Sequence, residues 1–200
     1  MRDRRPEDWR VDLRDRHGLE NLVAGAIDHH RGLTRLSSST SSMTRLDYQL
    51  LLPGDRLGEL ELKAKRQTYR NWPGLGPGVL DRDVFILDEL ALRRIVDAGR
   101  YAFLLVRDIP SDRWCLWGTA ELVLTTKIRV SRGLTRVAPT VKGKLLIDLG
   151  SAPVSCPTVE ASLDELCRMA RAIDERWDDI RPWPWIERTS SSGSIKARGA

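Results

Sequence analysis

Residues 46–65, LDYQLLLPGDRLGELELKAK, contain two short apolar runs joined by a Pro-Gly turn. The runs at 45–52 and 58–65 predict the two strands of a β-hairpin. Along the second run, Glu59, Glu61 and Lys63 occupy alternate positions. Alternate side chains of a strand share one face and lie roughly 6–7 Å apart. The second strand is therefore expected to carry two carboxylates and a lysine side by side.

Asp47, in the first run, joins this charged face in only one register. If odd-numbered residues pair with odd-numbered residues, as an odd-membered turn allows, Asp47 and Glu61 come within reach of a common ion; a one-residue slip turns Asp47 to the other face. Two converging carboxylates suit Mg²⁺, which keeps several waters for a substrate phosphate. A nearby lysine can then hold an attacking water or balance charge on the phosphate, as phosphodiester hydrolysis requires. The alternative is a charged strand face that only maintains solubility.

The hydrophobic pattern predicts further elements around the hairpin. Helices are expected over 17–30, over 86–99 and from after Pro157 to about 177, with Ser162 and Glu165 as a capping box. Strands are expected over 101–106, 113–118 and 144–150, and a loop over the serine-rich run 37–42. This order predicts an α/β fold with a mixed sheet, in which the helix over 86–99 crosses over to the buried strand that follows it.

The arrangement resembles the PD-(D/E)XK nuclease superfamily, and within it the archaeal-type Holliday-junction resolvases and VRR-NUC-like domains. Glu20 matches the helix glutamate, Asp47 the motif aspartate, and Glu61 and Lys63 the E-x-K, although Leu46 stands where the family pattern has proline. The resemblance covers roughly residues 16–108. It implies a restriction-endonuclease-like αβββαβ core, a mixed sheet flanked by helices, here with a C-terminal strand-and-helix extension.

The resemblance also implies an activity, that of a Mg²⁺-dependent DNA endonuclease of resolvase or restriction type. Asp47, Glu61 and Glu20 would bind the metal, for which Mn²⁺ is expected to substitute, and Lys63 would activate or position the nucleophilic water. Glu59 is an alternative to Glu61 or assists it. Resolvases act as two-fold dimers, so a homodimer is expected as well. Two other functions stay open: a non-catalytic nucleic-acid-binding or assembly subunit that keeps the fold, and a nuclease that acts on RNA.

The charge distribution favours a polyanionic partner. The chain carries a net charge of +5 with a pI near 9.4, and residues 126–144 contain six basic and no acidic residues. Such residues contact phosphates in a salt-dependent, sequence-independent way; the alternative is a solubilising surface. The residues expected to contact nucleic acid are Arg45, Lys65, Arg66, Arg70, Lys127, Arg129 and Arg132.

Length and composition limit the remaining possibilities. Two hundred residues favour one domain, expected over 17–185, with a core at 17–108, an extension at 109–185 whose family is not recognisable, a polar lead-in at 1–16 and a disordered tail at 186–200. No apolar run is long enough to cross a membrane, and the N-terminus does not resemble a secretory signal. Three cysteines without CxxC spacing are typical of reduced thiols, so a cytoplasmic location is expected.

The remaining motifs do not indicate a nucleotide or zinc site. No glycine-rich loop has the spacing of a nucleotide-binding fingerprint, so no nucleotide cofactor is expected. His29 and His30 end the first helix, where histidines complement the helix dipole, and no cysteine pair is placed to complete a zinc site.

A stripe on the C-terminal helix is apolar and serves either a dimer or the core: Val159, Leu163, Leu166, Ala170, Ile173 and Trp177.

Overall fold

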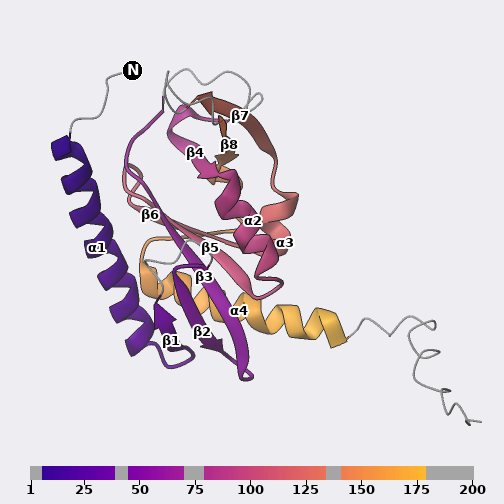
Figure 1. Cartoon of the computed structure of the whole chain (residues 1–200). Coiled ribbons are helices and arrows are strands. Elements are labelled where there is room, and N and C mark those ends of the chain that lie inside the picture. Colours follow the sequence, from indigo (N-terminus) through magenta and orange to yellow (C-terminus); the bar gives the residue numbers. More distant parts are fainter. Residues whose placement is uncertain (1–5, 39–44, 70–78, 134–140, 179–200) are drawn as a thin grey trace, which may run out of the picture.

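The computed structural model describes residues 6–38, 45–69, 79–133 and 141–178. Six strands form the larger sheet in the order β1-β2-β3-β5-β6-β9 (Figure 1). Only β3 and β5 pair in parallel, while the other neighbours are antiparallel, so the sheet is mixed as expected. The strands are β1 (Thr34–Ser38), β2 (Tyr48–Leu52), β3 (Arg56–Lys65), β5 (Ala102–Asp108), β6 (Arg113–Gly118) and β9 (Val154–Cys156).

The hairpin of β2 and β3 has the register in which Asp47 and Glu61 share one face of the sheet. Gln49 lies opposite Glu59, so odd-numbered residues pair with odd-numbered ones. The strands are joined by three residues, 53–55, of which Gly54 and Asp55 have φ angles of 77° and 58°. Glycine adopts this left-handed conformation without steric cost, and aspartate is among the few other residues that tolerate it. Because the turn has an odd number of residues, Asp47 falls on the same face of the sheet as Glu61 and Lys63.

A separate hydrophobic core lies on each face of the larger sheet. Even-numbered residues of β3, such as Leu60 and Leu62, pack with α1 (Pro6–His29) and α4 (Val159–Asp178). The opposite face, represented by Leu104 and Val106 of β5, packs with α2 (Glu89–Asp97), α3 (Thr119–Leu124) and a smaller sheet. Glu61 and Lys63 pair in register with Leu104 and Val106. The charged residues of β3 therefore lie on the α2 side of the sheet.

The smaller sheet contains most of the basic stretch. Its order is β4-β8-β7, all antiparallel, with β4 (Val84–Asp88), β7 (Lys127–Gly133) and β8 (Val141–Asp148). The helix predicted over 86–99 was wrong at its start, because residues 84–88 pair with β8 and the helix begins only at Glu89. Its end was confirmed: Gly99 follows the last turn with a φ of 89°.

Other element boundaries also differ from the sequence-based expectation. The first helix begins at Pro6 rather than near residue 17, and Ser37 and Ser38 belong to strand β1 rather than to a loop. In α4, Ala161 N donates to Thr158 Oγ1 (3.2 Å), so Thr158 caps the helix and not the pair Ser162 and Glu165. Strands β1, β4 and β9 and helix α3 were not predicted.

The apolar stripe of α4 belongs to the core. Val159, Leu163, Leu166 and Ala170 are buried against the sheet, and Ile173 packs beside them. The stripe therefore closes the fold. Within the described ranges, none of the helices combines the length and the apolar character that crossing a membrane demands. The expected tail at 186–200 and the side chain of Trp177 lie outside the described part of the chain.

Candidate active site

The hairpin brings Asp47, Glu61 and Lys63 together. Tyr48 lies opposite Leu60, and continuing this register by one step places Asp47 opposite Glu61. The Asp47 carboxylate accepts a hydrogen bond from the Leu62 backbone N–H (2.8 Å) and lies 3.9 Å from Lys63 Nζ. Lys63 in turn forms an ion pair with Glu61 Oε1. Two carboxylates and one ammonium group thus meet where β2 begins, beside the second half of β3.

Glu61 occupies the most buried position of this group. Its side chain is only 1% exposed, and burial raises the pKa of the carboxyl, as does the nearby Asp47 carboxylate. Lys63 and Arg94 act in the opposite direction without cancelling the rise in pKa. Arg94 NH2 donates to Glu61 Oε1 at 3.1 Å. Local sequence patterns could not predict this contact, because Arg94 lies 33 positions after Glu61 in the chain.

The two oxygens of Glu61 have different surroundings. Lys63 and Arg94 both bind Oε1. Oε2 is also buried, but it accepts no hydrogen bond from the described residues. A buried carboxylate oxygen without a donor is costly unless a cation completes its environment. Together with the Asp47 carboxylate, Oε2 fits the one or two carboxylates that Mg²⁺ ordinarily takes from a protein.

Glu20 does not join this pair. Its carboxylate is 3.4 Å from His17 Nδ1, and its backbone carbonyl accepts a hydrogen bond from the Tyr48 hydroxyl (2.8 Å), which belongs to the α1 side of the sheet. Within the described ranges, no three acidic, histidine or cysteine side chains are close enough to form a protein-only metal cage. The metal-binding role of Glu20 stays a prediction that this arrangement does not favour. Glu59, half-buried, lies two residues before Glu61 on the same strand.

The expectation that Lys65 contacts nucleic acid is corrected by its position. Lys65 and Asp108 side chains are both fully buried, with Lys65 Nζ 3.2 Å from Asp108 Oδ1. Lys65 also donates to the backbone carbonyl of Arg82, and Arg113 Nε donates to Asp108 Oδ2 (3.1 Å). This lysine therefore neutralises a buried aspartate at the ends of β3 and β5 and presents no charge to a ligand.

The other residues expected to contact nucleic acid are scattered over two regions. Arg45 is exposed next to the candidate site, and its carbonyl accepts a hydrogen bond from Arg94 (3.4 Å); Arg66 is half-buried just after β3. On β7, Lys127 donates to the Val123 carbonyl (2.9 Å), and burial lowers its pKa, while Arg129 is exposed and binds Glu89 (2.9 Å). Arg70 and the side chain of Arg132 lie outside the described residues.

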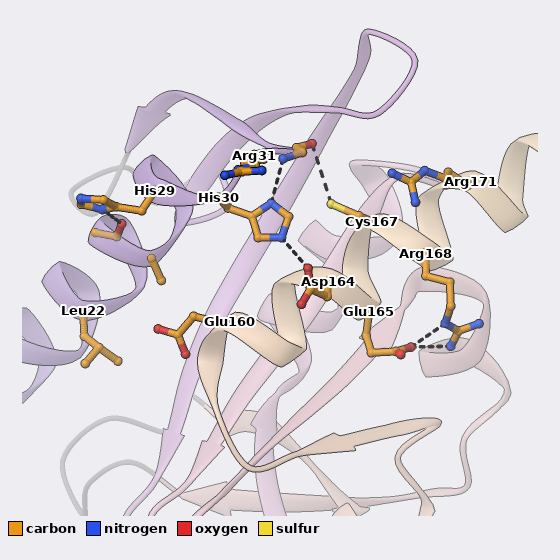
Figure 2. Close-up of a pocket in the computed structure, with 13 residues that line it drawn as sticks. Leu22, His29, His30, Arg31, Glu160, Asp164, Glu165, Cys167, Arg168 and Arg171 are labelled. Atoms are coloured by element: carbon orange, nitrogen blue, oxygen red, sulfur yellow. Dashed lines mark hydrogen bonds and ion pairs between the residues drawn. The ribbon is translucent and has the colours of Figure 1, made fainter.

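A groove of about 1060 Å³ lies between the end of α1 and the first half of α4 (Figure 2). His30 lies in it with both ring nitrogens occupied: Nδ1 accepts from the Gly32 N–H (3.1 Å), so Nε2 carries the proton and donates to Asp164 (3.0 Å). Cys167 donates weakly to the Gly32 carbonyl, and burial raises the pKa of its thiol. His30 therefore joins α1 to α4, and neither residue is poised as a base or nucleophile.

No protein-family model, no curated protein and no solved structure matches this chain. Function is therefore inferred from the residues of the site and from their geometry.

Proposed function

We propose that the protein is a metal-dependent phosphodiesterase that cleaves DNA, with Asp47, Glu61 and Lys63 as its catalytic group. One observation carries the proposal: the hairpin brings these three side chains together, and a buried oxygen of Glu61 accepts no hydrogen bond from the part of the chain that the structure describes. A structural ion pair between Glu61 and Lys63 would need no second carboxylate and no orphaned oxygen. The combination fits a site that is completed by a divalent cation.

The path of the chain supports the same proposal. An N-terminal helix is followed by three antiparallel strands, a helix and a strand parallel to the third: α1, β1, β2, β3, α2 and β5. This is the αβββαβ order implied by the resemblance to PD-(D/E)XK nucleases. The departure is strand β4, which precedes α2 and belongs to the smaller sheet. We infer a restriction-endonuclease-like core to which a second sheet is added.

Each residue has a distinct part in the proposed reaction. Asp47 and Glu61 would hold Mg²⁺, which when bound lowers the pKa of its water and offsets phosphate charge. The backbone N–H of Leu62 orients the Asp47 carboxylate. Lys63, which is 29% exposed, can reach a phosphate oxygen or an attacking water from the rim of the site. Arg94 binds Glu61 Oε1 from the α2 side, so that Oε2 would be available to a cation.

The absence of a third acidic ligand within the described ranges favours a second candidate, a nucleic-acid-binding subunit without turnover. The two candidates differ in one assay. Purified protein is incubated with supercoiled plasmid, a branched DNA and a structured RNA, each with Mg²⁺, with Mn²⁺ or with a chelator. Metal-dependent cleavage of DNA is expected; salt-dependent binding without cleavage would assign the second candidate, and cleavage of RNA alone would redefine the substrate.

The Lys63→Met variant tests the catalytic assignment, because it keeps an unbranched side chain only one atom shorter and removes the charge. We expect cleavage to fall at least about 100-fold, the usual loss when a group that acts on the reacting centre is removed. DNA affinity, measured by fluorescence anisotropy, should change little. Cleavage at the wild-type rate by Lys63→Met would refute the role of this residue.

A further inference from the structure

A second groove, of about 390 Å³, lies between the start of α2 and the strands β7 and β8. Three arginines line it, and one of them, Arg94, also contacts the candidate catalytic residue Glu61 (3.1 Å). The groove therefore adjoins the site where cleavage is proposed. Arg129, on β7, was expected from the sequence to contact phosphate.

A carboxylate occupies the basic part of this groove. Glu89 Oε1 binds Arg93 at 2.7 Å, and its Oε2 binds Arg129 at 2.9 Å. These two hydrogen bonds lower the pKa of Glu89, so the group is a fixed anion between two guanidinium groups. A phosphate would make the same contacts, because arginine binds carboxylates and phosphates with one geometry.

Gly143 of β8 makes room for this carboxylate. A Cβ atom at Gly143 would lie 1.8 Å from Glu89 Oε2 and 2.9 Å from its Cδ. The strand thus presents backbone without a side chain at the position where the Glu89 carboxylate lies. Arg93 and Arg129 remain 70% and 60% exposed, so both can still reach a ligand from solvent.

We propose that Glu89 is an internal substitute for a phosphate of the nucleic-acid backbone, which displaces it from Arg93 and Arg129 when the substrate binds. The identity of the ligand rests on the proposed function. The site holds a phosphate near the scissile position, and Glu89 keeps the two arginines oriented and discourages binding of weaker anions. The alternative is a plain structural ion-pair cluster that joins α2 to β7.

The Glu89→Gln variant separates these readings. Its affinity for a short fluorescein-labelled DNA duplex is measured by anisotropy in chelator, over a series of salt concentrations. Release of the two arginines should tighten binding roughly threefold to tenfold and steepen the salt dependence by roughly one phosphate contact. The Glu165→Gln variant is the matched control, because it releases Arg168 on α4, on the opposite face, by the same change of charge. Its affinity should stay near that of wild type.

Unchanged or weaker binding by Glu89→Gln would overturn the proposal, as would an equal gain by Glu165→Gln, which would show a general charge effect. The Arg129→Gln variant provides an independent measurement and should weaken binding; if it binds like the wild type, the proposal is again wrong. These outcomes do not depend on turnover. Tighter DNA binding by Glu89→Gln, together with no cleavage by the wild type, would support this inference and refute the nuclease proposal. Cleavage by the wild type without tighter binding by Glu89→Gln would refute this inference and support the nuclease proposal.

Discussion

Glu61 illustrates at the scale of one residue what the candidate site costs the fold. Its carboxylate is buried beside Asp47, and although Lys63 and Arg94 bind one oxygen, burial still raises the pKa of the group. A group whose pKa is higher in the folded than in the unfolded state stabilises the fold below its unfolded pKa, near 4.5, and that contribution is lost as the pH rises through the folded pKa. The ionised form is thus held at the expense of stability.

The raised pKa of Glu61 predicts how the stability of the Glu61→Gln variant depends on pH. In metal-free buffer, the difference in melting temperature between the variant and the wild type should move in favour of the variant as the pH rises from about 4 to neutrality, because the amide never ionises. Added Mg²⁺ should stabilise the wild type and leave the variant unaffected, since a ligand stabilises only the form that binds it. A constant difference over this pH range, or equal stabilisation by Mg²⁺, would contradict the account of Glu61.

The sequence alone predicted that Glu61 and Lys63 share one face of a strand, because alternation along a strand is a local rule. The sequence left the register of Asp47 open, and the observed register places Asp47 beside them. The sequence did not predict the partner from α2, Arg94, or the burial of Lys65. Both depend on which elements pack over the charged face. Lys63 and Lys65 are two residues apart on β3 and carry the same charge, yet the Lys63 side chain lies at the rim of the site and that of Lys65 is fully buried.

At the scale of elements, the ends of β3, β5 and β6 are joined by a buried charge cluster. Asp108 receives both Lys65 (3.2 Å) and Arg113 (3.1 Å), and Arg113 also binds Asp83 next to β4. Removing the shared anion leaves the fully buried Lys65 without its ion-pair partner and leaves Arg113 with Asp83 alone. Removing Lys65 leaves Asp108 with Arg113.

The Asp108→Asn variant should therefore lose more stability than Lys65→Met. We expect about 3–5 kcal/mol for the aspartate, the usual loss when one partner of a buried pair is removed, and a smaller loss for the lysine. Urea unfolding gives both values. Asp112→Asn is the control, because Asp112 is 88% exposed and its pair with Arg107 should contribute at most about 1 kcal/mol. An equally small effect at Asp108 would show that the buried cluster contributes little.

Elements were predicted best where one hydrophobic period extends over many residues. Helix α4 and strand β5 were expected close to their observed limits, whereas the short strands β1, β4 and β9 were missed. Residues 84–88 illustrate the reason: their pairing partner on β8 is about 60 residues further along the chain, and nothing local distinguishes them from the helix that follows. Pairing with a strand that is distant in the sequence thus outweighs the local conformational preference of these residues.

At the scale of the whole molecule, the larger sheet separates two hydrophobic cores. The α1 and α4 side supplies the larger core cluster, while the α2 side carries the candidate site and the arginine-lined groove. The smaller sheet, a feature not predicted from the sequence, brings part of the basic stretch to the same side as the carboxylates. Arg129 of β7 is thereby connected through α2 to Glu61.

Shortening one side chain of the apolar stripe of α4 tests whether the stripe belongs to the core. Leu166 is fully buried among the residues of the α1 side. Leu166→Ala should cost about 2–5 kcal/mol of unfolding free energy, the range for truncation of a buried leucine. Its oligomeric state, measured by light scattering, should equal that of the wild type, because the stripe is already covered within one chain. A change of oligomeric state with little loss of stability would instead place the stripe at an interface between copies.

Nicking of a supercoiled plasmid in Mg²⁺ by Glu61→Gln and Glu59→Gln, side by side with the wild type, tests whether Asp47, Glu61 and Lys63 form a catalytic group. The two variants make the same change of charge on the same strand, two residues apart, but only Glu61 shares the buried position with Asp47 and Lys63. We predict nicking by the wild type and by Glu59→Gln, and none above background by Glu61→Gln. Nicking by Glu61→Gln at the wild-type rate would contradict the proposed catalytic group.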